Sequence, residues 1–393
     1  MEKDTPPRIT DVEFAERRQR LRQHMQAAGV DLFIAYSDDR ATYGQQHARY
    51  LFDYQPHFEP CLSIVPLDGE AFIATGPESE ALVLASSRCR HVKIVDAFVH
   101  PDEEYPFIEI GSLAGLLKAG SASAKRRIAV AGADAMPRRL WEAVAAVTDG
   151  PFADGEAMIL GLRAVKSADE IAVIRHAYRI AEAGMRAGLA AVAEGVSERE
   201  IAAEAEYAMR RMGSEGMGID TIVGAGRANT HAIITRTTRH RISKGEHVLL
   251  TIAPRYEGYH GAIGRVAAVG QVDERIAHAM GTAIAAQAAT AAALRPGTLG
   301  RELDAIAREV CRKAGYEKNF AYTGIHSVGT VEFEPPILTS HSETRLVPGM
   351  VFSIDIPIFF APWGGLRLED GFLITEAGAE PLQDIPQAIH RVG

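Results

Sequence analysis

The chain has 393 residues, which is too many for one compact domain and indicates two or three. Hydrophobic residues make up 47% of the chain and charged residues 24%, a composition that excludes an intrinsically disordered protein. The net charge of −9 disfavours proteins that wrap nucleic acid, because those normally carry a basic excess.

Strand and helix signals alternate in the N-terminal part of the chain. Residues 11–28 place Phe14, Leu21 and Met25 on one face among charged residues, which predicts an amphipathic helix. A short apolar strand is predicted at 30–36, followed by a hairpin with Asp68-Gly69 in its loop. Such alternation is typical of an α/β domain, which we expect over residues 1–155.

A second domain is predicted over residues 160–393. Ser167 with Glu170 three residues later forms a capping box, so a long helix should begin there. A second helix should follow, then strand-like runs, two helices on either side of Pro296-Gly297, and a strand-rich C-terminal section. The strands cluster rather than alternating strictly with helices, which predicts an α+β domain.

No segment of the chain has the pattern of a targeting or membrane-spanning sequence. The first ten residues lack the apolar stretch of a signal peptide, and residues 279–294 are too short and too weakly apolar to cross a bilayer. The three cysteines form no CxxC pair, which argues against a thiolate zinc site. We therefore expect a cytoplasmic protein that binds neither membranes nor nucleic acid.

Two histidines lie in glycine-containing segments. His231 ends the small-residue segment GAGRANTH, where an imidazole is accessible and can titrate near neutral pH. A loop histidine bonded to the backbone is the simpler interpretation, although loop polar residues often carry function. His326 lies between Gly324 and Gly329, and glycines let the backbone turn sharply, which would leave the imidazole exposed in a cleft.

A third histidine lies on a predicted strand. Side chains alternate along a strand, so His260 shares one face with Ala262 and Gly264. The small neighbours leave space beside the imidazole, which could admit a substrate. Packing of that narrow face against a helix is the commoner reason for Ala and Gly.

Several acidic residues interrupt apolar segments near the C-terminus. Asp355 lies inside the run VFSIDIPI, where a carboxylate is costly to bury without a partner. Glu369 and Asp370 precede another apolar strand and could pair with Arg367. Buried acids near histidines are often part of active sites, so Asp355 and Glu369 are candidates.

From about Leu162 to the C-terminus, the chain resembles the creatinase/prolidase/aminopeptidase P superfamily. The matching segments in chain order are LRAVKSADEIAVIRHA, DTIVGAGRANTHA, KGEHVLLTIAPRYEGYHGAIGR, HSVG, LVPGMVFSIDIP and GGLRLEDGFLIT. The resemblance implies a pita-bread catalytic domain at residues 160–393, preceded by a creatinase-like α/β N-terminal domain at residues 1–155. It also implies a homodimer.

Metallopeptidases of this superfamily bind two divalent metals through two Asp, one His and two further carboxylates. On this chain those positions fall on Thr251, Ala262, His326, Asp355 and Glu369, and the second pocket histidine falls on Phe333. A hydroxyl and a methyl group cannot supply carboxylate charge to a hard cation. The resemblance therefore implies that a two-metal hydrolytic centre is missing.

Creatinase is the member of the superfamily that works without metal, and two segments are closest to it. These are HSVGT and the Thr/Arg-rich stretch that follows His231. The resemblance implies a proton-transfer role for His231, since an imidazole can accept and donate protons near neutral pH. The segment PHFEP places His57 and Glu59 near the position of a substrate-binding Arg in creatinase, and this reversal of charge disfavours creatine itself.

These features lead to the hypothesis of a metal-independent, creatinase-like hydrolase without a cofactor. It would cleave an amidino, amide or cyclic amidine C–N bond in a small polar molecule that is cationic or rich in nitrogen. The expected catalytic residues are His231, His326, Asp355 and Glu369, and the expected substrate contacts are His260, Glu59, His57, Phe359 and Trp363. Two alternatives stay open: a non-catalytic pita-bread scaffold, and a single-metal lyase or peptidase that uses His326, Asp355 and Glu369.

Overall fold

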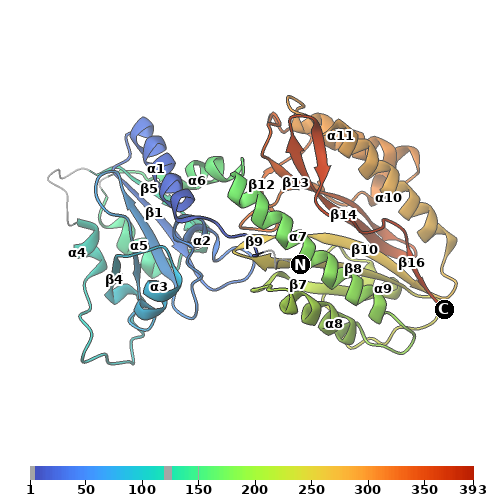
Figure 1. The fold of residues 1–393 in the computed structure, drawn as a ribbon, viewed down its shortest axis with the longest axis horizontal. Helices are drawn as coiled ribbons and strands as arrows, with labels where there is room; N and C mark the ends of the chain where they lie inside the picture. Colours follow the sequence, from blue (N-terminus) through green and yellow to red (C-terminus); the bar gives the residue numbers. More distant parts are fainter. Residues whose placement is uncertain (1–4, 119–125, 149) are drawn as a thin grey trace. The chain divides into compact units, whose positions relative to one another are not determined.

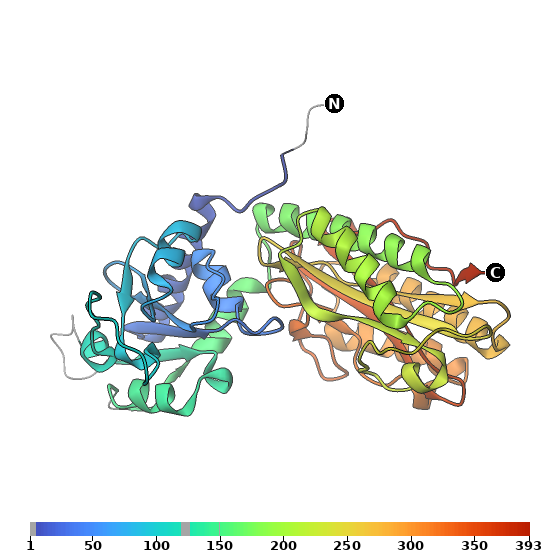
Figure 2. The same cartoon turned by 90° about the horizontal axis from the view of Figure 1, so that it is seen from below.

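The computed structural model describes residues 5–118, 126–148 and 150–393. The chain divides into two compact units, which Figures 1 and 2 trace from two directions. The N-terminal unit is Ile9–Arg163, and the C-terminal unit is Ala164–Gly393 together with Met1–Arg8. The domain limits predicted from the sequence, 1–155 and 160–393, stay a prediction.

The N-terminal unit is built on a six-stranded sheet in the order β4-β3-β2-β1-β5-β6. Its elements are α1 (Asp11–Ala28), β1 (Leu32–Ser37), α2 (Gln46–Phe52), β2 (Cys61–Pro66), β3 (Phe72–Thr75), α3 (Glu80–Ser86), β4 (Val92–Ile94), η1 (Asp96–Phe98), α4 (Leu113–Lys118), β5 (Ile128–Ala131), η2 (Ala133–Ala135), α5 (Arg138–Ala145), β6 (Ala153–Asp154) and α6 (Gly155–Arg163). The predicted helix at 11–28 and the β2–β3 hairpin are confirmed.

Alternation along β1 gives this sheet an apolar core on each face. Phe33 and Ala35 pack in a buried cluster with Leu21 of α1. Leu32 and Ile34 belong to a second cluster that includes residues of α4 and α5. Both faces of the sheet are therefore covered by helices, and the predicted α/β class is confirmed.

The C-terminal unit is built on a ten-stranded sheet whose main path is β12-β11-β13-β14-β10-β8-β7. Three further strands pair at its sides: β9 with β8, β15 with β14, and β16 with β10. The elements are α7 (Ala168–Ala191), α8 (Glu198–Arg211), β7 (Gly216–Ala225), α9 (Gly226–Thr230), β8 (His247–Tyr256), β9 (Tyr259–His260), β10 (Ile263–Val269), α10 (Glu274–Ala293), α11 (Gly300–Lys313), η3 (Glu317–Asn319), β11 (Ile325–Ser327), β12 (Glu334–Ile337), β13 (Val351–Ala361), β14 (Gly364–Thr375), β15 (Gly378–Pro381) and β16 (His390–Val392).

Helices of the C-terminal unit begin at capping boxes and pack against this sheet. The capping box predicted at Ser167 is present, and a second one at Ser197 starts α8. As Figure 1 shows, α7 packs against β8 and α8 against β7, whereas α10 lies against β13 and β14. This α+β arrangement is the predicted one. None of the helices in the described ranges combines the length and the apolar character needed to cross a bilayer.

One helix lies where the sequence pattern is broken. Between Pro151 and Gly161 no regular periodicity is visible, yet the structure contains β6 and α6 there. The Asp154 carboxylate accepts a hydrogen bond from the Ala157 backbone N–H at 2.8 Å, so it caps the first turn of α6. This cap is a local signal for the helix that the spacing of apolar residues does not carry.

Candidate functional site

The candidate site lies on a row of residues that crosses the C-terminal sheet. Asp355 on β13 is directly opposite Glu369 on β14, and Glu369 is opposite Gly264 on β10. Gly264 in turn pairs with Thr251 on β8. Antiparallel register thus aligns the positions on β8 and β10 with those on β13 and β14, which lie more than a hundred residues further along the chain.

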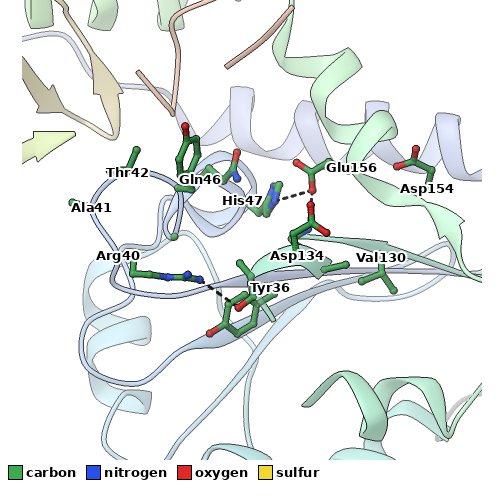
Figure 3. A pocket seen from close by; sticks show the side chains of 15 residues that line it. Tyr36, Arg40, Ala41, Thr42, Gln46, His47, Val130, Asp134, Asp154 and Glu156 are labelled. Carbon is green, nitrogen blue, oxygen red and sulfur yellow. Dashed lines mark hydrogen bonds and ion pairs between the residues drawn. The ribbon is translucent and has the colours of Figure 1, made fainter. Parts of the chain in front are cut away.

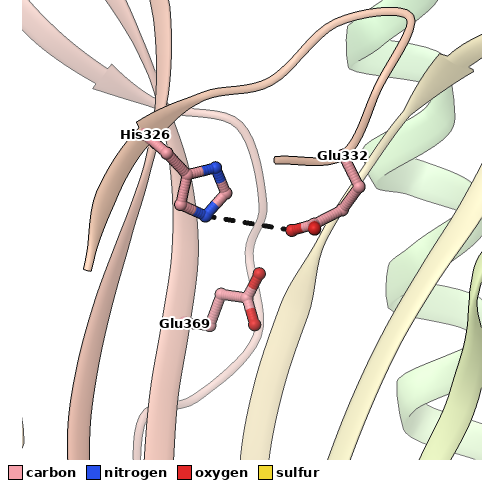
Figure 4. A group of neighbouring side chains, drawn as sticks. All are labelled: His326, Glu332 and Glu369. Atoms are coloured by element: carbon pink, nitrogen blue, oxygen red, sulfur yellow. Dashed lines mark ion pairs between the residues drawn. The ribbon is translucent and has the colours of Figure 1, made fainter. Parts of the chain in front are cut away.

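His326 on β11 is at the centre of the cluster, and its side chain is buried. Its Nε2 lies 3.6 Å from Asp355 Oδ1. Figure 4 shows the approach of the same nitrogen to Glu332 Oε1, at 3.9 Å, with Glu369 nearby. Its Nδ1 lies 3.1 Å from the Ser327 carbonyl oxygen, so a proton on Nδ1 is donated there and Nε2 presents its lone pair. No hydrogen bond in the described part of the chain engages Nε2.

The prediction that His326 is exposed in a cleft is wrong, and the neighbouring glycines give the reason. A Cβ at Gly324 would lie 2.0 Å from the Asp355 carbonyl oxygen, and a Cβ at Gly329 would lie 2.2 Å from Glu334 Oε1. Glycine at these positions lets β13 and the Glu334 side chain approach closely. The two glycines therefore bury the imidazole instead of opening space around it.

Asp355 is buried as expected and is well satisfied. It accepts hydrogen bonds from Tyr322 Oη at 2.8 Å and from Ser353 Oγ at 3.0 Å. Burial would raise the pKa of Asp355, but the neighbouring His326 and the positive charge of Arg367 lower it below its ordinary value. For His326 the directions are reversed. Burial lowers the pKa of this imidazole, but the negative charges of Asp355 and Glu332 outweigh that effect and hold the pKa above its ordinary value.

Glu369 is the least satisfied acid of the cluster. Ser353 Oγ donates to its Oε1 over a long 3.5 Å, and Oε2 has no hydrogen-bond partner in the described residues. Arg367 Nη1 lies 4.0 Å from Oε2. Burial, followed by the charges of Asp355 and Glu332, raises the pKa of Glu369 well above its ordinary value.

The expected site residues did not include two charged members of this cluster, Glu332 and Arg367, although Arg367 was expected to pair with Glu369 or Asp370. An extended segment would place Glu332 and Glu334 on one face, but residues 329–333 form a bend and β12 begins only at Glu334. Glu332 points toward His326, while Glu334 forms a buried ion pair with Lys166 at 3.3 Å. The acid-rich segment next to HSVG was the available signal.

His260 was expected to have open space beside it on its strand face, but its side chain is fully buried. The strand is interrupted after His260, because Gly261 packs so closely on α7 that a Cβ there would lie 2.6 Å from the Ala177 carbonyl carbon. The His260 imidazole Nδ1 donates to the Gly329 carbonyl oxygen at 2.9 Å, and its backbone N–H donates to the same oxygen. His260 thus holds the bend that carries Glu332.

His231 follows α9 and is half-buried. Its ring meets the Phe360 ring edge-on with centroids 5.6 Å apart, and its Nδ1 has no hydrogen-bond partner among the described residues. Two residues on, the Ile233 carbonyl oxygen accepts a hydrogen bond from Arg367 Nη2 at 3.3 Å. The His231 loop is therefore tied to the cluster through Arg367.

Three aromatic rings differ in whether they contact the cluster. Phe359 is fully buried and lies 5.8 Å from the Arg367 guanidinium, so it contacts a member of the cluster. Trp363 packs in the apolar core and meets His247 edge-on. Phe333 lies against His326 with ring centroids 4.3 Å apart, where it excludes water from one side of the imidazole.

The remaining predicted contacts, His57 and Glu59, belong to the N-terminal unit. His57 is exposed, whereas Glu59 is buried and accepts from the Glu78 backbone N–H at 3.3 Å. Glu59 lines a cavity of about 320 Å³. A separate cavity of about 870 Å³ lies where β1, β5 and β6 end, beside the His47–Glu156 pair (Figure 3), and neither predicted residue lines it.

Comparison with known proteins identifies relatives of the C-terminal unit. Residues 172–376 match the model of the metallopeptidase family M24. An Xaa-Pro dipeptidase of Pyrococcus furiosus is 35% identical over 227 residues, which is 57% of this chain and 64% of that protein. An uncharacterised peptidase of Bacillus subtilis is 31% identical over 62% of this chain and 69% of its own length. The chain thus spans slightly less than two thirds of the Pyrococcus relative.

Solved structures extend the likeness to nearly the whole chain. An X-Pro aminopeptidase from Thermotoga maritima superposes with a TM-score of 0.82 at 23% identity, covering 95% of this chain and 99% of that one. A prolidase from Pyrococcus furiosus gives a TM-score of 0.78 at 26% identity, covering 93% and 99%. The predicted pita-bread fold with an α/β N-terminal domain is confirmed.

These comparisons correct the function expected from the sequence. The expectation of a metal-independent, creatinase-like hydrolase of non-peptide C–N bonds is wrong, because the matching family is one of metallopeptidases and the relatives from two Pyrococcus species are Xaa-Pro dipeptidases. The wider superfamily was identified correctly, but closeness to its creatinase-like members is not supported. The named relatives give no support to a non-catalytic scaffold either.

The metal centre that the family implies fits this chain only in part. At two of the five ligand positions are a Thr251 hydroxyl, buried and without a hydrogen-bond partner in the described residues, and a fully buried Ala262 methyl group. These groups cannot hold a second divalent cation. One ligand atom from each of His326, Glu332 and Glu369 lies within 4.8 Å of the other two, so the residues fit one ion and not two.

Proposed function

Because the chain belongs to the metallopeptidase family M24, we propose that it is a hydrolase that cleaves the peptide bond of a short peptide. The proposal rests mainly on one observation: three buried carboxylates lie around a buried imidazole whose Nε2 has no hydrogen-bond partner in the described residues. The named relatives suggest an Xaa-Pro dipeptide as the first substrate to test. A homodimer stays a prediction.

The residues of the cluster have distinct tasks in this proposal. When bound, a divalent cation supplies Lewis-acid polarisation of a carbonyl oxygen. Asp355, fixed by Tyr322 and Ser353, adds a negative charge 3.6 Å from His326 Nε2. Arg367 offsets part of the negative charge and ties the His231 loop to the cluster through the Ile233 carbonyl oxygen.

His231 is proposed as a substrate contact. Its Nδ1 is buried without a hydrogen-bond partner in the described residues, so it can donate to or accept from a polar atom of the peptide. Phe360, half exposed, covers one edge of the ring. His260 and Trp363 have structural contacts instead, and we assign them no direct role with substrate.

The first experiment measures hydrolysis of Ala-Pro and Ala-Ala by the full chain, with added divalent metal and with chelator. We expect turnover of Ala-Pro that chelator abolishes. His326→Ala removes the central imidazole and should lower kcat/KM by about 100-fold or more, since residues that merely support metal ligands already account for up to about that factor. Release of free proline is the measured quantity.

The matched control is His341→Ala, because His341 is exposed and its side chain has no hydrogen bond in the described residues. This variant should hydrolyse Ala-Pro at the rate of the unmodified protein. The proposal fails if neither dipeptide is hydrolysed under any metal condition, or if His326→Ala leaves the rate unchanged.

A further inference from the structure

The cluster around His326 holds more negative than positive charge. Glu332, Asp355 and Glu369 are 5%, 4% and 1% exposed, and Arg367 provides one compensating charge. Asp355 is satisfied by two hydroxyl donors, but Glu369 Oε2 has no hydrogen-bond partner in the described residues. Buried carboxylates without partners are costly, so this arrangement favours a further cation.

The geometry of three donor atoms suits such a cation. Three donor atoms bonded to one ion at about 2.1 Å with tetrahedral angles lie about 3.4 Å from one another. The donors of His326, Glu332 and Glu369 lie within 4.8 Å of one another, so side-chain shifts that shorten these separations by about 1 Å would bring them to a common ion. The His326 Nδ1–H donates to a backbone carbonyl, the usual arrangement for a metal-binding imidazole.

Glu332 reaches the cluster because its bend is anchored on both sides. Glu334 pairs with Lys166 and accepts from the Val331 backbone N–H, while the Gly329 carbonyl accepts from the His260 imidazole. The bend between them directs the Glu332 carboxylate to within 3.9 Å of His326 Nε2. A carboxylate is thereby supplied from the β11–β12 connection, whereas Thr251 on β8 and Ala262, which comes just before β10, supply none.

We propose that this chain holds a single first-row divalent transition-metal ion, with Glu332 as a ligand beside His326 and Glu369. A mixed nitrogen and oxygen donor set suits ions such as Co²⁺, Mn²⁺ or Zn²⁺ better than Mg²⁺ or Ca²⁺. This inference deepens the proposed function and concerns the same site. Its test measures metal binding and not turnover, so the two can fail separately.

The experiment titrates the metal-stripped full chain with Co²⁺ and follows both calorimetry and visible absorption. We expect one Co²⁺ per chain and a d–d band that saturates at that ratio. Glu332→Gln keeps the side-chain volume but removes the charge, and should weaken Co²⁺ binding at least about tenfold. Circular dichroism of each variant checks that it is folded.

Two further variants complete the design. Glu376→Gln, at an exposed turn residue, should bind Co²⁺ like the unmodified chain. Glu332→His should either shift the d–d band or abolish binding, because an imidazole would replace a carboxylate in the coordination sphere. The inference is overturned if the unmodified chain binds two Co²⁺ or none, or if Glu332→Gln and Glu332→His both bind with unchanged affinity and spectrum.

Discussion

At the scale of single residues, the ionised form of Glu369 is electrostatically unfavourable in the cluster. It is almost completely buried, and its carboxylate has only a long contact from Ser353 and a distant guanidinium. Burial and the neighbouring acids raise the pKa of Glu369 well above its ordinary value. Without a metal ion, ionisation of this side chain therefore opposes folding.

The sign of the resulting pH dependence follows from proton binding. An acid with a raised pKa in the folded state binds more protons folded than unfolded, so the free energy of unfolding falls as pH rises above about 4.5. Glu369→Gln removes this loss. In chelator, we expect the melting temperature of the variant to exceed that of the unmodified protein by more at pH 8 than at pH 5.

The difference in melting temperature can be converted into a free energy. A change of 1 kcal/mol in the free energy of unfolding shifts the melting temperature of a domain of this size by roughly 2–4 °C. Glu376→Gln serves as the control and should show the same difference at both pH values. An equal shift for Glu369→Gln at pH 5 and pH 8 would contradict the assignment.

At the scale of elements, α8 fixes the loop that carries His231. The buried carboxylate of Glu198, in the first turn of α8, accepts from the Ala225 and Thr238 backbone N–H groups, from Asn229 Nδ2 and from Thr238 Oγ1. These partners lie on both sides of His231 in the chain. One carboxylate thus closes the loop from 225 to 238.

Glu198→Gln should therefore loosen this loop. An amide oxygen replaces only one of the two accepting oxygens, and hydrogen bonds to charged groups are worth about 1.5–3 kcal/mol each. We expect a loss of about 3 kcal/mol in the stability of the C-terminal unit, measured by urea unfolding, and faster amide exchange at residues 225–238.

The same helix offers a matched control for this prediction. Glu204 is exposed on α8, and Glu204→Gln should change neither quantity beyond about 0.5 kcal/mol. Unchanged amide exchange in Glu198→Gln would show that other contacts hold the His231 loop.

At the scale of the whole molecule, each unit has its own apolar core. Leu140 of α5 belongs to a cluster formed within the N-terminal unit, and Leu303 of α11 belongs to the core of the C-terminal unit. A unit with its own core can unfold as a cooperative unit.

We expect two calorimetric unfolding transitions that respond to different substitutions. Leu140→Ala and Leu303→Ala each leave a buried cavity, which costs about 2–5 kcal/mol. Each variant should lower the midpoint of one transition and leave the other in place. A single transition lowered by both substitutions would show that the units unfold together.

Local features of the chain were predictable because their causes lie within a few residues. The capping box at Ser167 set the start of α7, and the apolar spacing from Asp11 set α1. Asp355 was identified as a buried acid because its immediate neighbours on β13 are apolar. The pita-bread fold followed from motifs in the correct order.

The sequence by itself thus determined the two fold classes and the helices that begin at Asp11 and after Ser167, and its motifs placed Thr251 and Ala262 where the resemblance implies carboxylates. Only the tertiary structure showed that Glu332 turns inward, that His260 supports a bend, and that His326 is enclosed. Capping and periodicity act over one or two turns of chain, whereas these outcomes depend on strand register and on close backbone approach at Gly261, Gly324 and Gly329, which distant segments create.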